Sequence, residues 1–153
     1  MDEGDAVARI EFDVDTALPP EKVKAMLLDF SDRRPDTWPG LGRVQYKVYS
    51  IGETSAEIRE GNKRPNVWAR ERYDWSRPGI VRWEVIESNF SAPGSFLEAH
   101  LNPKEGGGTT VHIVWSRTPT SAMGRVALGL IKITKGAPVK ASMKAAFKKA
   151  EAS

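Results

Sequence analysis

A carboxylate stands in a row of aromatic side chains between Asn66 and Ser88. Read as a strand, residues 66–75 alternate with period two, so that Glu71 points the same way as Tyr73 and Trp75. A buried carboxylate must be hydrogen-bonded, paired with a cation or protonated, because a free charge is costly to bury. A carboxyl group beside a phenol can accept a ligand hydroxyl or exchange a proton. Glu71 and Tyr73 are therefore the candidate catalytic residues.

Three interpretations of Glu71 remain open. In the preferred one, it pairs with an inward-facing arginine such as Arg117, or hydrogen-bonds Tyr46 or Tyr73, and stabilises the core. In the second, it contacts a ligand in a pocket. In the third, the strand contains a bulge and Glu71 is exposed to solvent.

Large aromatic side chains are frequent on the faces that the alternation turns inward, and the chain has five tryptophans in 153 residues. Buried Trp and Tyr need polar partners, which a packed core and a ligand pocket both supply, so both interpretations stay open. If the row lines a pocket, the expected ligand-binding residues are Trp38, Tyr46, Ile58, Glu71, Tyr73, Trp83, Trp115, Met123, Ala127 and Leu130.

Several other chemistries lack the residues they need. The chain has no cysteine, and His100 and His112 are its only histidines, without HxxxH or HExxH spacing. Alternation places both histidines outside the expected cavity. No GxSxG motif marks a nucleophile, and Gly106-Gly107-Gly108 is typical of a hairpin turn. We expect no metal site and no cofactor.

The charges are distributed unevenly along the chain. Residues 1–15 carry six acidic residues and one arginine, whereas residues 120–153 carry seven basic residues and one acidic residue. A basic segment can bind nucleic acid or an anionic membrane. A solvated helix face is preferred here, because no aromatic residues for base stacking lie between the lysines. We expect no nucleic-acid partner.

Hydropathy predicts neither a leader nor a membrane span. The acidic N-terminus has no apolar core, and the apolar stretch 126–133 is too short to cross a bilayer. The chain is therefore expected to be cytoplasmic, without stable membrane insertion. Its length favours a single domain over residues 1–153.

The periodicities predict an α+β protein. Strands are expected at 6–15, 44–49, 56–60, 66–75, 80–88, 95–102 and 109–117. A helix should open at Pro19-Pro20, a second short one should cover 31–34, and a long C-terminal helix should kink at Gly136-Ala137-Pro138. Short connections make the sheet antiparallel, and a curved sheet can wrap around the C-terminal helix. Met123, Ala127 and Leu130 are then expected to face Trp83 or Trp115.

This order resembles the helix-grip fold of the START and polyketide-cyclase-like (SRPBCC) superfamily. The segments that carry the resemblance are "ARIEFDVDTALPPEKVKAMLLDF", "DTWPGL" and "TSAMGRVALGLIKITKG". The resemblance implies an apolar ligand held between sheet and helix, and in some members cyclisation or dehydration in the same cavity.

The favoured function is the binding of a small apolar or amphipathic molecule, lipid-like or polycyclic, by a monomer or homodimer. The alternative is an enzyme of polyketide cyclase or dehydratase type. A second alternative is a surface-interaction protein that uses its basic C-terminal helix. We expect the intact protein not to bind anionic vesicles, on the premise that this helix uses its apolar stripe for its own sheet.

Overall fold

The computed structural model describes residues 8–64 and 66–153, and in that part of the chain it has seven strands and four helices. The predicted start of the first strand, at Ala6, lies outside the described residues. The strands are β1 (Ala8–Thr16), β2 (Lys47–Ile51), β3 (Ser55–Asn62), β4 (Val67–Asp74), β5 (Ile80–Ser88), β6 (Phe96–Pro103) and β7 (Thr109–Arg117). The helices are α2 (Pro20–Leu27), α3 (Arg34–Thr37), α4 (Ala122–Ile133) and α5 (Ala137–Glu151).

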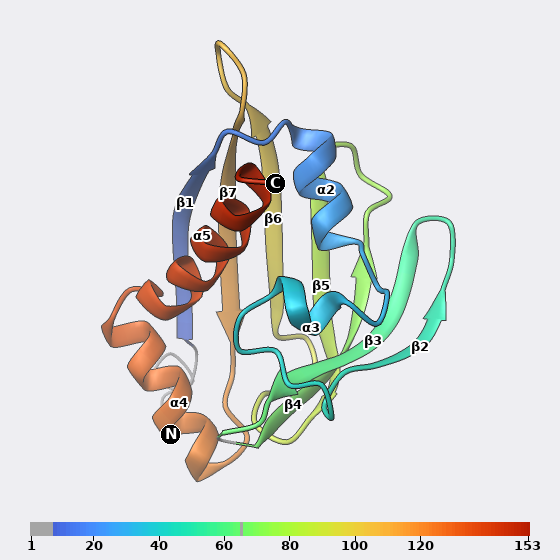
Figure 1. The fold of residues 1–153 in the computed structure, drawn as a ribbon. Coiled ribbons are helices and arrows are strands. Elements are labelled where there is room, and N and C mark those ends of the chain that lie inside the picture. Colours follow the sequence, from blue (N-terminus) through green and yellow to red (C-terminus); the bar gives the residue numbers. More distant parts are fainter. Residues whose placement is uncertain (1–7, 65) are drawn as a thin grey trace.

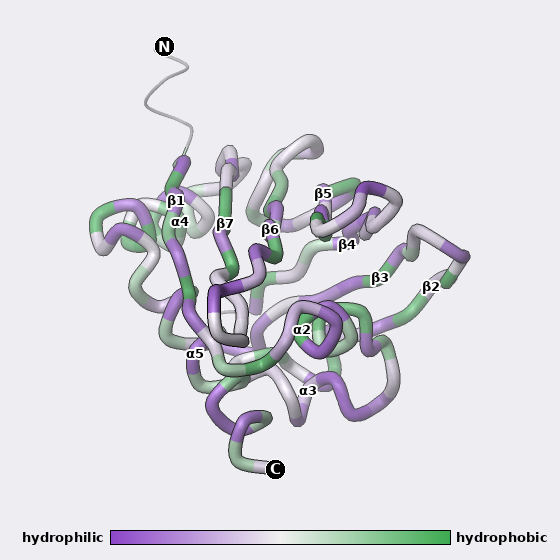
Figure 2. Tube along the Cα trace, turned by 90° about the horizontal axis from the view of Figure 1, so that it is seen from above, coloured by the Kyte–Doolittle hydropathy of each residue, from purple (hydrophilic) through white to green (hydrophobic). Residues whose placement is uncertain are grey.

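The strands form one antiparallel sheet in the order β1-β7-β6-β5-β4-β3-β2. Hairpins join consecutive strands from β2 to β7, and β1 closes the order by pairing with β7. The sheet curves strongly, and α5 crosses its concave side (Figure 1). Viewed from above, the strands form an arc with α2, α3 and α5 on its inner side (Figure 2). The predicted α+β helix-grip architecture is confirmed.

Period-two alternation accounts for the two faces of the sheet. On β7 the buried residues are Val111, Ile113 and Trp115, which alternate with partly exposed neighbours. On β4, Glu71 is buried and Arg72 is exposed. The predicted inward direction of Glu71 is therefore confirmed. The register of β4 against β5 shifts between Arg70 and Glu71, so a bulge is present, but it leaves Glu71 buried.

The short helix differs from its prediction. It runs over α3 (Arg34–Thr37) instead of residues 31–34, and Pro35 lies in its first turn. Proline is tolerated there because first-turn N–H groups have no partner within the helix. The expectation that the helix would stop before Pro35 was wrong for this reason.

The C-terminal segment breaks where proline and glycine predict it. Gly136 has a φ of 79°, in the left-handed region, and separates α4 from α5. The sheet is covered by α5, through the buried side chains of Met143, Ala146 and Phe147. Among the described residues, no helix combines the length and the apolar character needed to cross a bilayer.

The orientation of α4 corrects the expectation for two of its residues. Met123 and Leu130 are 39% and 59% exposed and do not face the sheet, while Gly124 and Leu128 are buried. A Cβ atom at position 124 would lie 2.4 Å from the carbonyl oxygen of Phe90. Glycine thus lets this side of the helix approach the 88–91 loop, which turns Met123 and Leu130 outward.

Candidate functional site

A cavity of about 420 Å³ lies between the concave face of the sheet and the C-terminal helices. This volume is within the usual range for small-molecule sites. Strands β3 to β7 supply the inner wall, α5 supplies the opposite wall through Val139 and Met143, and the 38–41 loop contributes a further part of the wall. The Oγ of Ser142 donates a hydrogen bond of 3.0 Å to the carbonyl oxygen of Pro39, joining α5 to that loop.

Five of the ten predicted ligand-binding residues line this cavity. They are Trp38, Glu71, Tyr73, Trp83 and Trp115. The other five lie elsewhere. Ile58 is fully buried in the core, Tyr46 and Ala127 are half-buried outside the lining, and Met123 and Leu130 are exposed on α4.

The aromatic walls have defined geometry. The rings of Tyr73 and Trp83 stack with centroids 4.8 Å apart and an interplanar angle of 12°. Phe30 meets Tyr73 edge to face at 5.1 Å. The buried indole nitrogen of Trp38 has no hydrogen-bond partner within the part of the chain that the structure describes. A buried donor of this kind is costly unless a partner reaches it, and Trp38 is one of the residues that line the cavity.

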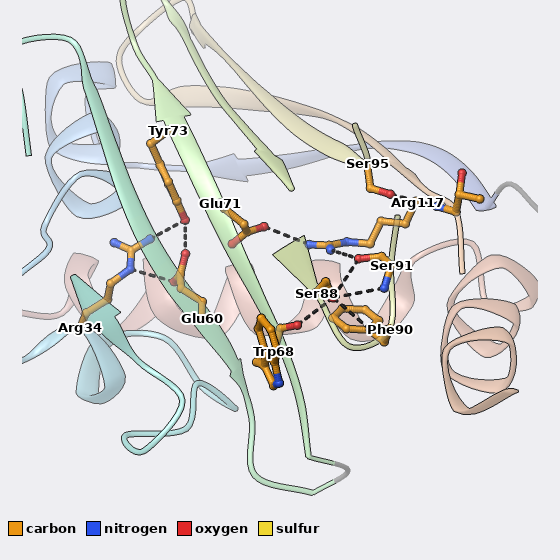
Figure 3. Close-up of polar contacts among 11 residues, drawn as sticks. Arg34, Glu60, Trp68, Glu71, Tyr73, Ser88, Phe90, Ser91, Ser95 and Arg117 are labelled. Carbon is orange, nitrogen blue, oxygen red and sulfur yellow. Dashed lines mark hydrogen bonds and ion pairs between the residues drawn. The ribbon is translucent and has the colours of Figure 1, made fainter. Parts of the chain in front are cut away.

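One end of the polar lining is organised by a buried arginine. Arg34 is 3% exposed, and its Nε lies 2.9 Å from Oε2 of Glu60. Its remaining nitrogens donate to the hydroxyl of Tyr73 at 2.9 Å and to the carbonyl oxygens of Leu27 and Asp29 (Figure 3). The Tyr73 hydroxyl in turn donates to Glu60. All the polar atoms of this triad are therefore paired, as a buried charge requires.

The contacts within the triad fix the protonation states of Arg34 and Tyr73 at neutral pH. Burial alone would lower the pKa of Arg34, but Glu60 and Tyr73 together raise it. Burial and the neighbouring Glu60 carboxylate raise the pKa of Tyr73 well above its ordinary value. At neutral pH, Arg34 is a cation and Tyr73 a neutral phenol.

Glu71 forms the second polar part of the lining. Its Oε2 accepts a hydrogen bond of 3.3 Å from Arg117, which also donates to the Oγ of Ser91 at 3.1 Å (Figure 3). Pairing of Glu71 with Arg117, the preferred interpretation from sequence, is confirmed. Because Glu71 also lines the cavity, pairing does not remove it from reach of a ligand.

Burial controls the titration of Glu71. It is 3% exposed, and burial, reinforced by the Glu60 carboxylate, raises its pKa to about 8 despite the opposing effect of Arg117. The carboxyl group therefore carries its proton over most of the range below pH 8 and exchanges it near neutral pH. A carboxyl group in that state can donate a hydrogen bond to a ligand oxygen.

Two residues of the polar lining, Glu60 and Arg34, were not predicted from the sequence. The inward direction of Glu60 could have been predicted, because Ala56, Ile58 and Glu60 fall on one face of a strand that alternates with period two. The sequence gives no such indication for Arg34, because it opens the four-residue helix α3 and its partners Glu60 and Tyr73 are 26 and 39 residues away.

The histidines lie apart from the cavity lining, as expected. They pair across β6 and β7 with ring centroids 6.0 Å apart. His112 contacts the carboxylates of Asp13 and Glu11, and the hydrogen bond with Asp13 is the main cause of its raised pKa. Across residues 8–64 and 66–153, no three His, Asp or Glu side chains are grouped to hold a metal ion.

Solved structures share this fold at low sequence identity. The aromatase/cyclase Zhui from Streptomyces sp. R1128 is 13% identical with a TM-score of 0.75, covering 95% of this chain and 94% of that one. A START superfamily protein from Mycobacterium smegmatis is 8% identical with a TM-score of 0.68, covering 92% and 97%. Norcoclaurine synthase from Thalictrum flavum, in complex with dopamine and hydroxybenzaldehyde, is 12% identical with a TM-score of 0.68, covering 94% and 85%.

The chain matches no protein-family model and no curated relative. Structural matches at sequence identities this low show a shared fold and do not show a shared activity. The sheet order, the helix across the concave face and these structural matches together show that the chain has the helix-grip fold of the START and polyketide-cyclase-like proteins.

Proposed function

We propose that this protein binds a small amphipathic molecule with a flat ring system in the cavity between the sheet and α5. The observation that carries the proposal is the combination of three indole rings with two arginine–carboxylate pairs around one space of about 420 Å³. A flat apolar ring of the ligand can pack against Trp83 and Trp115. Hydroxyl or carbonyl oxygens of the ligand can hydrogen-bond with Glu71 and the Trp38 indole nitrogen.

The polar groups narrow the ligand class further. Arg34 is paired with Glu60, and Arg117 already donates hydrogen bonds to Glu71 and Ser91. A protonated Glu71 is a donor, and the Trp38 nitrogen is another. We therefore favour ligands that present oxygen acceptors on a flat ring system, such as flat phenolic ketones.

Replacing Trp83 with leucine is expected to weaken binding of a hydroxylated anthraquinone by about tenfold. The change removes the ring that faces the cavity while filling part of its volume, and a lost aromatic contact is worth about 1 kcal/mol or more. Quenching of tryptophan fluorescence in a titration measures the affinity.

Trp68→Leu is the matched control, because Trp68 lies on the same pair of strands but on the outer face. It should leave the affinity unchanged. Equal losses in both variants, or no saturable binding by the parent, would contradict the proposal.

A second candidate function is cyclisation or dehydration of a polyketide-like substrate. It is favoured by one observation, a cavity-lining carboxyl group, Glu71, whose raised pKa allows proton exchange near neutral pH. Glu71 would then act on a bound carbonyl as the acid–base group, while the hydroxyl of Tyr73, the other candidate from the sequence, stays engaged with Arg34 and Glu60. A linear poly-β-ketone analogue is the substrate that tests it: recovery of the analogue at its spontaneous rate of reaction supports binding alone, whereas cyclisation or dehydration that is lost in Glu71→Gln would favour the enzyme.

A further inference from the structure

Helix α4 turns an apolar stripe to solvent. Met123, Val126, Leu130 and Ile133 are 39%, 66%, 59% and 79% exposed, and they recur at i, i+3, i+7 and i+10. We refer to these four side chains as the α4 stripe. Single exposed apolar residues are common on protein surfaces, but a continuous stripe along three turns of a helix indicates an interaction surface.

The stripe is on the side of α4 that points away from the protein. The packed side of the helix contains Gly124 and Leu128, with Ile131 bordering the cavity. At about 100° per residue, the centre of the α4 stripe falls nearly opposite these three positions. The helix lies at the edge of the molecule in both views (Figures 1 and 2). The premise that the C-terminal helix uses its apolar stripe for its own sheet holds for α5, where Met143, Ala146 and Phe147 are buried, but not for α4.

Basic residues lie along one flank of the stripe. Arg125 and Lys132 on α4 and Lys135 in the following turn are all exposed. Beyond them α5 adds four lysines, and Glu151 is the only acidic residue after Glu105. A second copy of the chain would bring the same cations against these and be repelled. An anionic surface would be attracted to them.

We propose that α4 docks reversibly onto an anionic membrane surface. The α4 stripe would enter the boundary between headgroups and acyl chains, and Arg125, Lys132 and Lys135 would contact anionic headgroups. A helix of 12 residues with a polar flank suits a position in the interface plane. Because Ile131 of the same helix borders the cavity, docking would bring the cavity wall to the membrane. The docking itself does not depend on what the cavity binds.

Co-sedimentation with vesicles tests the proposal. The full chain should bind phosphatidylcholine vesicles that contain about one third phosphatidylserine, and bind pure phosphatidylcholine vesicles much more weakly. The double variant Val126→Gln/Leu130→Gln should lower the partition coefficient roughly tenfold or more, since it removes two of the four inserted side chains. Arg125→Gln/Lys132→Gln should lower binding only to the anionic vesicles.

The double variant Val44→Gln/Ile51→Gln is the matched control. These residues are 80% and 59% exposed; Ile51 ends β2, which is the edge strand at the other end of the sheet order from β1, and Val44 lies shortly before β2. Circular dichroism verifies that each variant is folded. Equal losses from both pairs of substitutions, or no binding to anionic vesicles by the parent, would overturn the proposal. So would a dimer in sedimentation velocity that dissociates in Val126→Gln/Leu130→Gln, because the stripe would then bind a second copy.

Discussion

Glu71→Gln is expected to remove the larger part of the loss of stability that the parent protein shows as pH rises from 5 to 8.5, leaving the smaller part that the raised pKa of His112 contributes. The pKa of Glu71 is about 8 in the folded protein, against 4.5 for an ordinary glutamate. At a pH between these two pKa values, Glu71 has released its proton in the unfolded chain but retains it in the folded chain. Unfolding therefore releases a proton, and rising pH lowers the free energy of unfolding. Glutamine cannot ionise and should abolish this contribution, which is on the order of 3 kcal/mol.

Urea unfolding at pH 5, 6.5 and 8.5 measures the effect. At pH 5 both side chains are neutral and accept the hydrogen bond from Arg117, so the two proteins should differ by about 1 kcal/mol or less. At pH 8.5 the variant should be the more stable protein. If the unfolding free energies of the parent and the variant changed in parallel from pH 5 to 8.5, the account would be contradicted.

Glu57→Gln is the control for this comparison. Hydrogen bonds from Arg70 and Arg72 lower the pKa of Glu57, so its contribution is present above the ordinary pKa and is lost only as pH falls below it. Between pH 5 and 8.5 its curve should run parallel to that of the parent.

Arg34→Met is expected to cost about 3–5 kcal/mol of unfolding free energy. The substitution removes the cation beside Glu60 and leaves the carbonyl oxygens of Leu27 and Asp29 without their donor. Glu60 keeps the hydrogen bond from Tyr73 but loses its cation in a partly buried position, and this loss outweighs the loss of packing because methionine fills most of the same space. Urea unfolding at neutral pH measures the loss.

Two further variants test whether the loss of stability comes from breaking the buried network or from removing any positive charge. Arg33→Met changes the exposed neighbouring arginine and should stay within about 0.5 kcal/mol of the parent. The double variant Arg34→Met/Glu60→Met removes both partners and should recover part of the loss. An Arg34→Met variant as stable as the parent would show that the triad contributes nothing to folding.

The sequence predicted the sheet well because burial and backbone geometry act together there. A period of two places Glu71, Tyr73 and Trp83 on one face whatever their partners are, and the glycine turns set which strands pair. The partner of Glu71 was also within reach, since Arg117 is one of few arginines on an inward face.

The orientation of α4 could not be obtained in the same way. This helix is apolar on two sides, with Leu128 on one and Leu130 on the other, so periodicity alone gives two orientations. The choice depends on Gly124, which allows close approach to the carbonyl oxygen of Phe90. Such a contact between distant segments leaves no local pattern, and the same is true of Arg34.

Methyl NMR tests the central claim, that a ligand binds in the cavity between sheet and α5, most directly. Met143 lines the cavity, whereas Met123 is exposed on α4 and Met26 lies outside the lining. With methyl-labelled methionine, saturating hydroxylated anthraquinone should give intermolecular NOEs to the methyl group of Met143 and none to those of Met26 or Met123. NOEs to Met123 with none to Met143 would place the ligand on the surface and contradict the account.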